Sequence, residues 1–511
     1  MGTHHFPVTT RSARAQQYVD QGLAFVYGFN HDEAIRSFEE AARIDPRCAM
    51  APWGTALALG PNYNLPLDSE RAHKARTAID RAVALAGAAT PRERAYIQAL
   101  AKRYGRHPDS DDRKALDRAY ANAMREVAKR YPDDLDASVL FAESLMVLRP
   151  WDLWTLDGQP QPDTEEIVAT LERVLARDPG HPGANHYYIH AVEASPHPER
   201  ALTAANTVAA TMPDAGHIVH MPSHIYMRVG RYADAADTNT SAIKVDEAYI
   251  AAQKPAGVYA MMYYPHNVYF FWSAASMEGR SADAIKAATE LGAQVEPEML
   301  RAMPAMEYYA PTLLFAYVRF GRWKEILAAQ RPSDDCPYSL AMWKHARGLA
   351  LAATGKLDEA EQALAELRQA AARVPADRII ADNQPAGMHL ALAERVLAAD
   401  IAARRGPIDE AVRALEDAVR VEDRLPYTEP PPWYQPVRHR LGLIYLRAGR
   451  LAEAEATYRE DLRRNPDNGW ALFGLGQTLR RSGKTNDAAA IDERLHRAWA
   501  RADVRLETSA F

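Results

Sequence analysis

Residues 436–466 read PVRHRLGLIYLRAGRLAEAEATYREDLRRNP, and this stretch decides how the rest of the chain is interpreted. Small and aromatic residues occur in it at fixed offsets: Leu441, Gly442, Tyr445, Gly449, Ala454, Tyr458 and Pro466. The same offsets return near the start of the chain in GLAFVYGFNHDEAIRSFEEAARIDP, residues 22–46. Looser copies follow later in the sequence. A pattern that returns at a fixed period predicts a repeat architecture.

The stretch 436–466 closely resembles a tetratricopeptide repeat. The resemblance implies two short antiparallel helices, which Gly442 and Ala454 allow to approach each other, while Tyr445 and Tyr458 fill the space between neighbouring pairs. One pair cannot bury its apolar face alone, so pairs stack into a superhelix with a concave and a convex side. We therefore predict an all-α, right-handed superhelical solenoid of antiparallel helix pairs. The resemblance is nearly silent on function, because such arrays host many activities.

The domain organisation follows from how far the copies extend, which is almost the whole chain. We expect one continuous solenoid over residues 1–511. Within it, we expect N-terminal repeats in 1–148, central histidine-rich repeats with insertions in 149–295, and C-terminal repeats in 296–511.

Three stretches depart from the repeat by adding residues: 60–68, 149–161 and 248–264. Insertions in a solenoid usually fall on one rim. Loops rich in Trp, Tyr and Met are therefore candidates for lids that fold over the groove. The alternative is that they only patch an irregular superhelix.

The composition is that of an ordinary globular chain of 511 residues, with 61 Lys and Arg against 67 Asp and Glu. The net charge of −6 does not indicate a basic surface of the kind that binds nucleic acid, so nucleic acid is not expected as a partner. Cys48 and Cys336 lie too far apart for a CxxC motif, which argues against a disulfide framework or a thiolate metal site. No apolar run is long enough for a signal peptide or a membrane span. We expect a cytoplasmic protein with no membrane partner.

Histidine gives the strongest functional signal. The chain has 17 histidines, and they are concentrated between His181 and His266. When the repeat phase is set without using histidine, six of them fall at the second, fifth or ninth place of a first helix. These places line the concave groove in tetratricopeptide arrays, and spacings of three and four keep side chains on one helical face. The six are His186, His190, His217, His220, His224 and His266.

Six converging imidazoles predict a transition-metal site. Imidazoles in contact repel when protonated and gain little from each other when neutral, and a metal ion removes that conflict. Imidazole nitrogen suits copper, zinc, iron and nickel. We prefer copper because the site is almost wholly nitrogen, while iron or zinc stays possible. The histidines could form one three-histidine site with spare neighbours or two sites of three.

Glu193 extends the first histidine group on the same helical face and is the candidate catalytic residue. It would be a ligand in an iron site of two histidines and one carboxylate, or the general base of a zinc hydrolase. Pro222 is best placed at the start of a helix. His217 and His220 would then lie on a non-helical lead-in segment, and Pro265 before His266 would repeat this arrangement.

Two classes of function remain. The first is a metal-dependent enzyme, for which we favour a copper-dependent or non-haem iron oxidoreductase acting on a small-molecule substrate in the groove. A zinc-dependent hydrolase is a further alternative. The second is a tetratricopeptide scaffold that binds a protein or peptide. Phosphate-binding loops and serine-hydrolase motifs are not found in the sequence.

Overall fold

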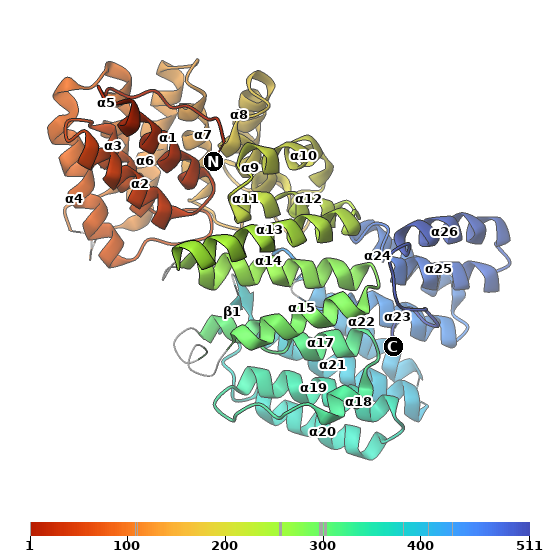
Figure 1. Cartoon of the computed structure of the whole chain (residues 1–511). Helices are drawn as coiled ribbons and strands as arrows, with labels where there is room; N and C mark the ends of the chain where they lie inside the picture. The colour runs from red at the N-terminus through yellow and green to blue at the C-terminus, as the bar shows by residue number, and fades with distance from the viewer. Residues whose placement is uncertain are drawn as a thin grey trace. The chain divides into compact units, whose positions relative to one another are not determined.

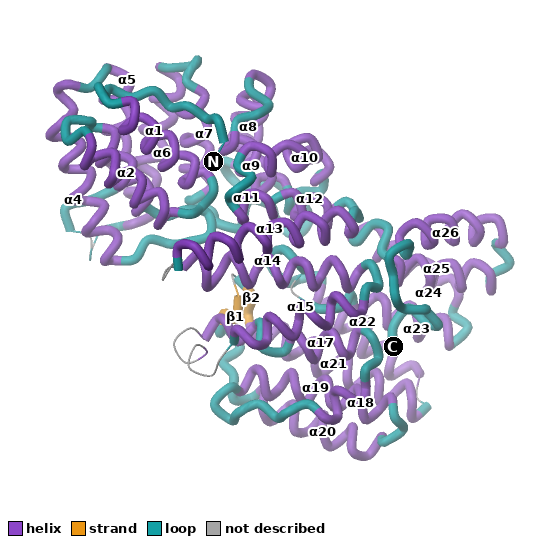
Figure 2. The backbone as a smooth tube through the Cα atoms, viewed as in Figure 1, coloured by secondary structure: helices purple, strands orange, loops and turns teal. Residues whose placement is uncertain are grey.

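The computed structural model describes residues 2–107, 109, 111–254, 258–295, 300, 304–381, 383–406, 408–431 and 433–511. This part of the chain is built almost entirely of helices, so the predicted all-α solenoid of helix pairs is confirmed (Figures 1 and 2). Its named strands form one short antiparallel pair, β1 (Ile379–Ala381) and β2 (Gln384–Pro385).

The chain divides into two compact units. Unit 1 comprises Met1–Ile225 and Ser241–Tyr264, and unit 2 comprises Tyr226–Thr240 and Pro265–Phe511. The boundary therefore falls inside α12 (Pro222–Arg228), α13 (Tyr232–Gln253) and α14 (Val258–Met277). Each unit is described by itself below.

Unit 1 is a stack of helices in which sequence neighbours pack as pairs, such as α1 on α2, α3 on α4 and α7 on α8. The helices are α1 (Ala13–Tyr27), α2 (His31–Ile44), α3 (Met50–Leu59), α4 (Ser69–Leu85), α5 (Pro91–Leu100), α6 (Arg113–Arg130), α7 (Leu135–Met146), α8 (Thr164–Arg177), α9 (Pro182–Val192), α10 (Leu202–Thr211) and α11 (Gly216–His220), with short turns η1 (Ala86–Ala88), η2 (Ala101–Arg103) and η3 (Pro198–Ala201).

Unit 2 repeats this organisation, with α19 on α20, α21 on α22, α23 on α24 and α25 on α26. Its elements are α15 (Ser281–Gln294), η4 (Pro304–Tyr308), α17 (Thr312–Arg319), α18 (Trp323–Ala328), α19 (Pro337–Ala353), α20 (Leu357–Ala371), α21 (Ala386–Arg405), α22 (Ile408–Glu422), α23 (Val437–Arg447), α24 (Leu451–Arg464), α25 (Gly469–Arg481) and α26 (Thr485–Ala498).

Glycine is what brings the paired helices together. A Cβ built on Gly442 in α23 would lie 2.5 Å from the ring of Tyr458 in α24, which is fully buried. The first repeat uses the same device, because a Cβ on Gly22 would lie 2.8 Å from the ring of Phe38. The predicted role of Gly442 as the residue that lets two helices approach is confirmed.

We expect Gly442→Ala to lower the free energy of unfolding by about 1–3 kcal/mol, because an added methyl in a close-packed interface forces side chains or backbone to shift. Denaturant unfolding followed by circular dichroism measures the change. The matched control is Gly292→Ala in α15, where a Cβ meets nothing within 4 Å and where alanine is the better helix former by up to about 1 kcal/mol. Equal destabilisation by both substitutions would contradict the packing explanation.

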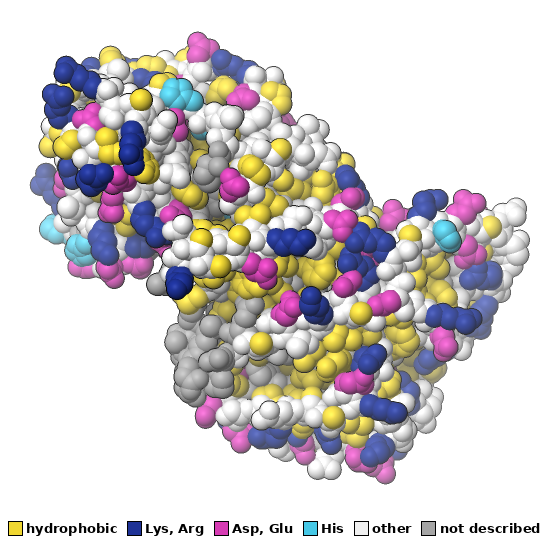
Figure 3. Space-filling view, in the orientation of Figure 1, with side chains coloured by type: hydrophobic (Ala, Val, Ile, Leu, Met, Phe, Trp, Pro, Cys, Tyr) yellow, Lys and Arg dark blue, Asp and Glu magenta, His cyan; other side chains and the backbone are white. Residues whose placement is uncertain are grey.

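The molecular surface differs from the interior in its histidine content. Figure 3 shows charged side chains of both signs interspersed over one face, with histidine at only a few isolated places. Within the described residues, no helix has both the length and the apolar character needed to cross a membrane.

Candidate metal centre

Three helices of unit 1 bring five of the six predicted histidines together. His186 and His190 lie one turn apart on α9, His217 and His220 lie on α11, and His224 lies on α12. All five side chains are buried, with at most 1% of their surface exposed. The histidine cluster, as we name these five residues, is thus an interior feature and does not line an open groove.

The sixth histidine is described with the other unit. His266 lies in the part of α14 that belongs to unit 2. It is half-buried there, and its ring centroid is 5.2 Å from that of Phe270. A role for His266 as a metal ligand stays a prediction.

Two local expectations about proline were tested by the helix bounds. Pro222 does begin a helix, α12, as predicted. The segment before it is not extended, however, because Gly216–His220 forms the short helix α11. Pro265 lies inside α14, so the prediction that it starts a helix was wrong. Helical residues thus flank both prolines: Pro222 separates two short helices, while α14 continues through Pro265.

The five imidazole rings form a closed loop. Each ring contacts the next, and the centroid distances around the loop are 4.9 Å for His217 to His186, 4.9 Å for His186 to His190, 5.3 Å for His190 to His224, 4.8 Å for His224 to His220 and 5.8 Å for His220 to His217. The coordinating atoms of His186, His190 and His217 all lie within 4.8 Å of one another. The loop is therefore compact enough for several nitrogens to reach one ion.

The Nδ1 atoms of the cluster are engaged by groups that accept hydrogen bonds. Glu193 receives the Nδ1–H of His190 at 2.7 Å and that of His224 at 2.6 Å, one on each carboxylate oxygen. The carbonyl of Tyr27 receives that of His186 at 2.5 Å. A carboxylate or a carbonyl only accepts, so these contacts place the ring proton on Nδ1.

His220 is fixed in the same tautomer by Ser223. The Ser223 hydroxyl donates to the carbonyl of His220 at 2.7 Å, which leaves its oxygen to accept from His220 Nδ1 at 3.1 Å. In a neutral imidazole one nitrogen carries the proton and the other carries the lone pair. The Nε2 atoms of His220 and His224 therefore both present lone pairs.

These lone pairs face each other. The Nε2 atoms of His220 and His224 are 2.9 Å apart. The Nε2 atoms of His186 and His217 are 3.1 Å apart, a distance at which His217 Nε2–H can donate to His186. The Nε2 of His190 is buried and has no hydrogen-bond partner among the described residues. Two neutral nitrogens that both present lone pairs at 2.9 Å repel, and a buried unpaired nitrogen costs free energy.

Burial disfavours the charged form of two imidazoles in the cluster. It lowers the pKa of His190, and it lowers that of His186 well below the ordinary value, with the charge of His190 adding to the effect. Burial alone would raise the pKa of Glu193, but His224 and His190 outweigh it and lower this pKa to about 2. The result is one buried, ionised carboxylate that accepts the Nδ1–H of both imidazoles.

Aromatic rings enclose the histidine cluster. The ring of Phe29 lies 4.5 Å from that of His186, and it also contacts His190 and His217 at 5.9 and 5.6 Å. Tyr263 lies 4.6 Å from His217. These apolar walls keep water from the Nε2 atoms.

Phe29 holds its place through an unusual backbone conformation. It has φ +56, whereas glycine occupies the corresponding turn in later repeats, with φ +78 at Gly230, +74 at Gly279 and +73 at Gly449. A bulky residue rarely adopts this region, and such strain clusters at functional sites. Phe29 was not among the residues predicted from the sequence. An aromatic residue at a turn position where other repeats have glycine could have indicated it.

Two of the three insertions reach the cluster as loops. Tyr63 from 60–68 and Trp151 from 149–161 lie 5.3 and 5.6 Å from the His190 ring, and 5.3 Å from each other. The third, 248–264, is not a loop where it is described. Its residues continue α13 and α14, and 255–257 lie outside the described residues. A lid movement stays a prediction for the first two.

A second polar group in unit 1 adjoins the cluster through Tyr27. The buried carboxylate of Asp136 on α7 accepts from the Tyr27 hydroxyl at 2.6 Å and from His4 Nε2 at 2.8 Å. His181 Nε2 lies 3.4 Å from the same oxygen. Burial lowers the pKa of His4, but the hydrogen bond and charge of Asp136, with smaller effects of Asp20 and Asp178, raise it overall.

This raised pKa predicts how the His4 contact depends on pH. A group whose folded pKa lies above its unfolded value of about 6.5 stabilises fully below that value and loses the contribution as pH rises through the folded pKa. At pH 6 we expect the free energy of unfolding to be larger for wild type than for His4→Gln. This difference should be smaller at pH 8, and urea unfolding at both pH values measures it. A difference that grows with pH would contradict this assignment.

Comparison with known proteins bears on the fold. The sequence model of the tetratricopeptide repeat matches residues 438–469. The chain is similar to a human IFIT1 dimer solved with m7Gppp-AAAA, at 12% identity over 84% of this chain and 87% of that one, with a TM-score of 0.34. It is also similar to yeast Tom70, at 10% identity over 95% and 91% of the two chains, with a TM-score of 0.29. No curated protein matches the sequence.

The predicted repeat at residues 436–466 thus overlaps the matched residues, and its two helices are α23 and α24. The same pairing of neighbouring helices organises both units. The match to the tetratricopeptide-repeat family covers this one repeat, residues 438–469.

Proposed function

We propose that unit 1 binds a transition metal through the Nε2 atoms of its histidine cluster. The observation that carries the proposal is the 2.9 Å separation between Nε2 of His220 and Nε2 of His224, because both rings have their protons on Nδ1. A proton shared between the two rings is the competing cation, with Glu193 at 2.6 Å from His224 as its counter-ion, and the metal content of the protein distinguishes the two. The proposed ligands are His186, His190, His217, His220 and His224.

The distances suit coordination. A metal–imidazole bond is about 2.0–2.1 Å, so two nitrogens on one ion lie about 2.9 Å apart at a right angle and about 3.3 Å apart in a tetrahedron. The Nε2–Nε2 separations of 2.9 and 3.1 Å fall within this span. The loop of five rings offers enough donors for one ion with spare neighbours, or for two ions.

Copper is the metal that the donor set favours. All the proposed donors are imidazole nitrogens, which suit copper, zinc, iron and nickel. An iron site of two histidines and a carboxylate would need Glu193 as a ligand, yet its two oxygens each accept an Nδ1–H. We therefore assign Glu193 a positioning role behind two ligands, as carboxylates commonly have at metal-bound histidines. Iron and zinc are outcomes of the test.

The activity we propose for such a centre is that of an oxidoreductase acting with dioxygen on a small molecule, since copper and non-haem iron support this chemistry. Zinc in the same place would point to hydrolysis instead. Binding of a protein or peptide is the second candidate, favoured by the tetratricopeptide fold. The expectation that nucleic acid is not a partner rests on net charge alone.

Elemental analysis of protein purified without a histidine-affinity step tests the proposal. We expect one or two equivalents of copper, iron or zinc, lost on chelation and restored by the metal that was present. Replacement of the exposed His496 by Ala is the control for adventitious surface binding and should change nothing. Protein that holds no metal as purified and takes up none of these ions at stoichiometric concentration would overturn the proposal and favour the scaffold function.

A further inference from the structure

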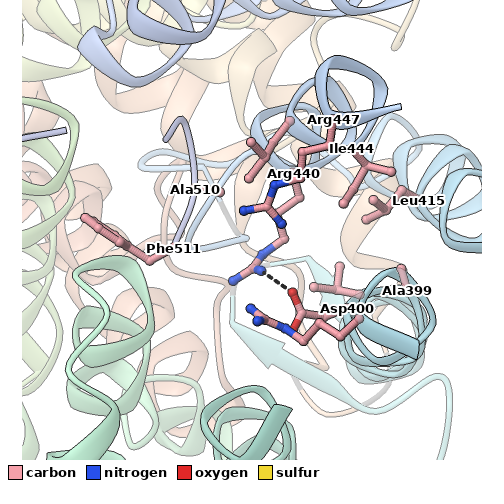
Figure 4. A pocket seen from close by; sticks show the side chains of 11 residues that line it. Ala399, Asp400, Leu415, Arg440, Ile444, Arg447, Ala510 and Phe511 are labelled. Atoms are coloured by element: carbon pink, nitrogen blue, oxygen red, sulfur yellow. Dashed lines mark hydrogen bonds and ion pairs between the residues drawn. The ribbon is translucent and has the colours of Figure 1, made fainter. Parts of the chain in front are cut away.

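A small pocket in unit 2 lies where α21, α22 and α23 meet (Figure 4). Its volume is about 20 Å³, and a cavity of roughly 10–15 Å³ is needed to hold one water. Leu415 and Ile444 form an apolar part of its wall, and Phe511 lies at another side. The pocket has room for one small group and not for a peptide or a nucleotide.

The side chains that line this pocket carry more positive than negative charge. Arg404, Arg440 and Arg447 line it, against a single carboxylate, Asp400. Asp400 accepts from Arg404 Nε at 2.9 Å and from Arg440 Nη1 at 3.2 Å, and the second of these bonds is drawn in Figure 4. Three guanidinium groups and one carboxylate leave two positive charges on the lining side chains.

Arg440 is the buried member of the set. Only 7% of its surface is exposed, and its Nη2 is buried without a hydrogen-bond partner among the described residues. A buried charged donor left unpaired is costly, so a group that accepts from it is favoured. Arg404 and Arg447 are exposed and stand at the solvent side.

We propose that this pocket binds a small tetrahedral dianion of the phosphate type. Guanidinium groups suit such an ion because their N–H groups match its oxygens in pairs. The ion would accept from Arg440 Nη2 at the floor and from Arg404 and Arg447 at the opening. Its charge of about −2 near neutral pH balances the two excess positive charges, which a carboxylate would only half neutralise. This site is independent of the metal centre in unit 1.

Isothermal titration of the full chain with inorganic phosphate, at constant ionic strength to hold screening fixed, tests the proposal. We expect saturable binding of one equivalent. Arg440→Met should weaken it at least tenfold, because it removes the buried donor. Asp400→Asn should tighten it several-fold, because it removes the competing carboxylate. Arg413→Met, an exposed change on α22 outside the pocket, changes net charge equally and should leave binding unaltered.

The two pocket substitutions are expected to change phosphate affinity in opposite directions. If the side chains only stabilised the fold, both substitutions would weaken binding. The proposed site would be refuted if wild type showed no saturable phosphate binding. It would also be refuted if Arg440→Met bound phosphate as tightly as wild type, or if Asp400→Asn bound it more weakly. Acetate that binds as well as phosphate would overturn the dianion. Glucose 6-phosphate that binds better than inorganic phosphate would overturn the small-ion assignment.

Discussion

The double variant His190→Asn/His224→Asn is expected to lose its metal while keeping its helical fold. Both side chains are buried and bonded to Glu193, so alanine would leave that carboxylate buried and unpaired. Asparagine is the sharper change, because its amide N–H donates from about the position of Nδ1 and no atom replaces Nε2. Metal affinity should fall more than about 100-fold, since changes behind the ligands alone commonly cost 10–100-fold.

The matched control for this variant is His345→Asn in unit 2. His345 is equally buried and its Nδ1 contacts the carbonyl of Ala393, as Nδ1 of His186 contacts a carbonyl in unit 1. Competition with a metal chelator measures affinity, and circular dichroism checks the fold. Unchanged metal content in the double variant would refute the assignment of ligands, and equal loss in the control would show that folding, not coordination, was affected.

Glu193→Gln is expected to weaken metal binding 10–100-fold without abolishing it. The amide oxygen can accept from one Nδ1–H, but the amide nitrogen meets the other Nδ1–H as a second donor. That imidazole must then move its proton to Nε2, where it no longer offers a lone pair to the metal. Equilibrium competition titration measures the affinity, and turnover is measured on metal-loaded protein.

The control is Glu199→Gln, because Glu199 also contacts a histidine Nδ1, that of His197 at 3.1 Å, but both side chains are exposed. It should leave metal affinity unchanged. Complete loss of the metal from Glu193→Gln would make the carboxylate a ligand, as in an iron site. Unchanged affinity with turnover reduced on the order of 100 to 10,000-fold would make it a general base. Either result contradicts the positioning role.

Much of the fold was predictable because tetratricopeptide packing is local. Gly442 and Tyr458 are separated by one turn between helices, so their contact follows from the repeat itself. The phase of the repeat also placed His186 and His190 on one face, and the structure brings them into ring contact at 4.9 Å. Positions fixed by helix periodicity can be read from one sequence.

The rest of the candidate site depends on contacts distant in sequence. Phe29 and His186 are far apart in the chain, and periodicity does not predict the distance between them. It also does not predict which atoms of Glu193 and the histidines meet. Tautomers are set by such partners: Tyr27 supplies the carbonyl for His186 although they belong to different repeats. Periodicity specifies the face of a helix, while the partner on the opposite side comes only from tertiary packing.

The aromatic enclosure determines how fast an ion can enter or leave. Phe29, Tyr63 and Tyr263 are each at most 7% exposed, and they stand against the rings that present Nε2. A chelator in solution cannot reach a bound ion until these side chains move apart. Exchange should therefore follow first-order kinetics set by the opening of unit 1, with a half-life that does not shorten as chelator concentration rises. The same protein could bind its metal with moderate affinity and still retain it through a purification.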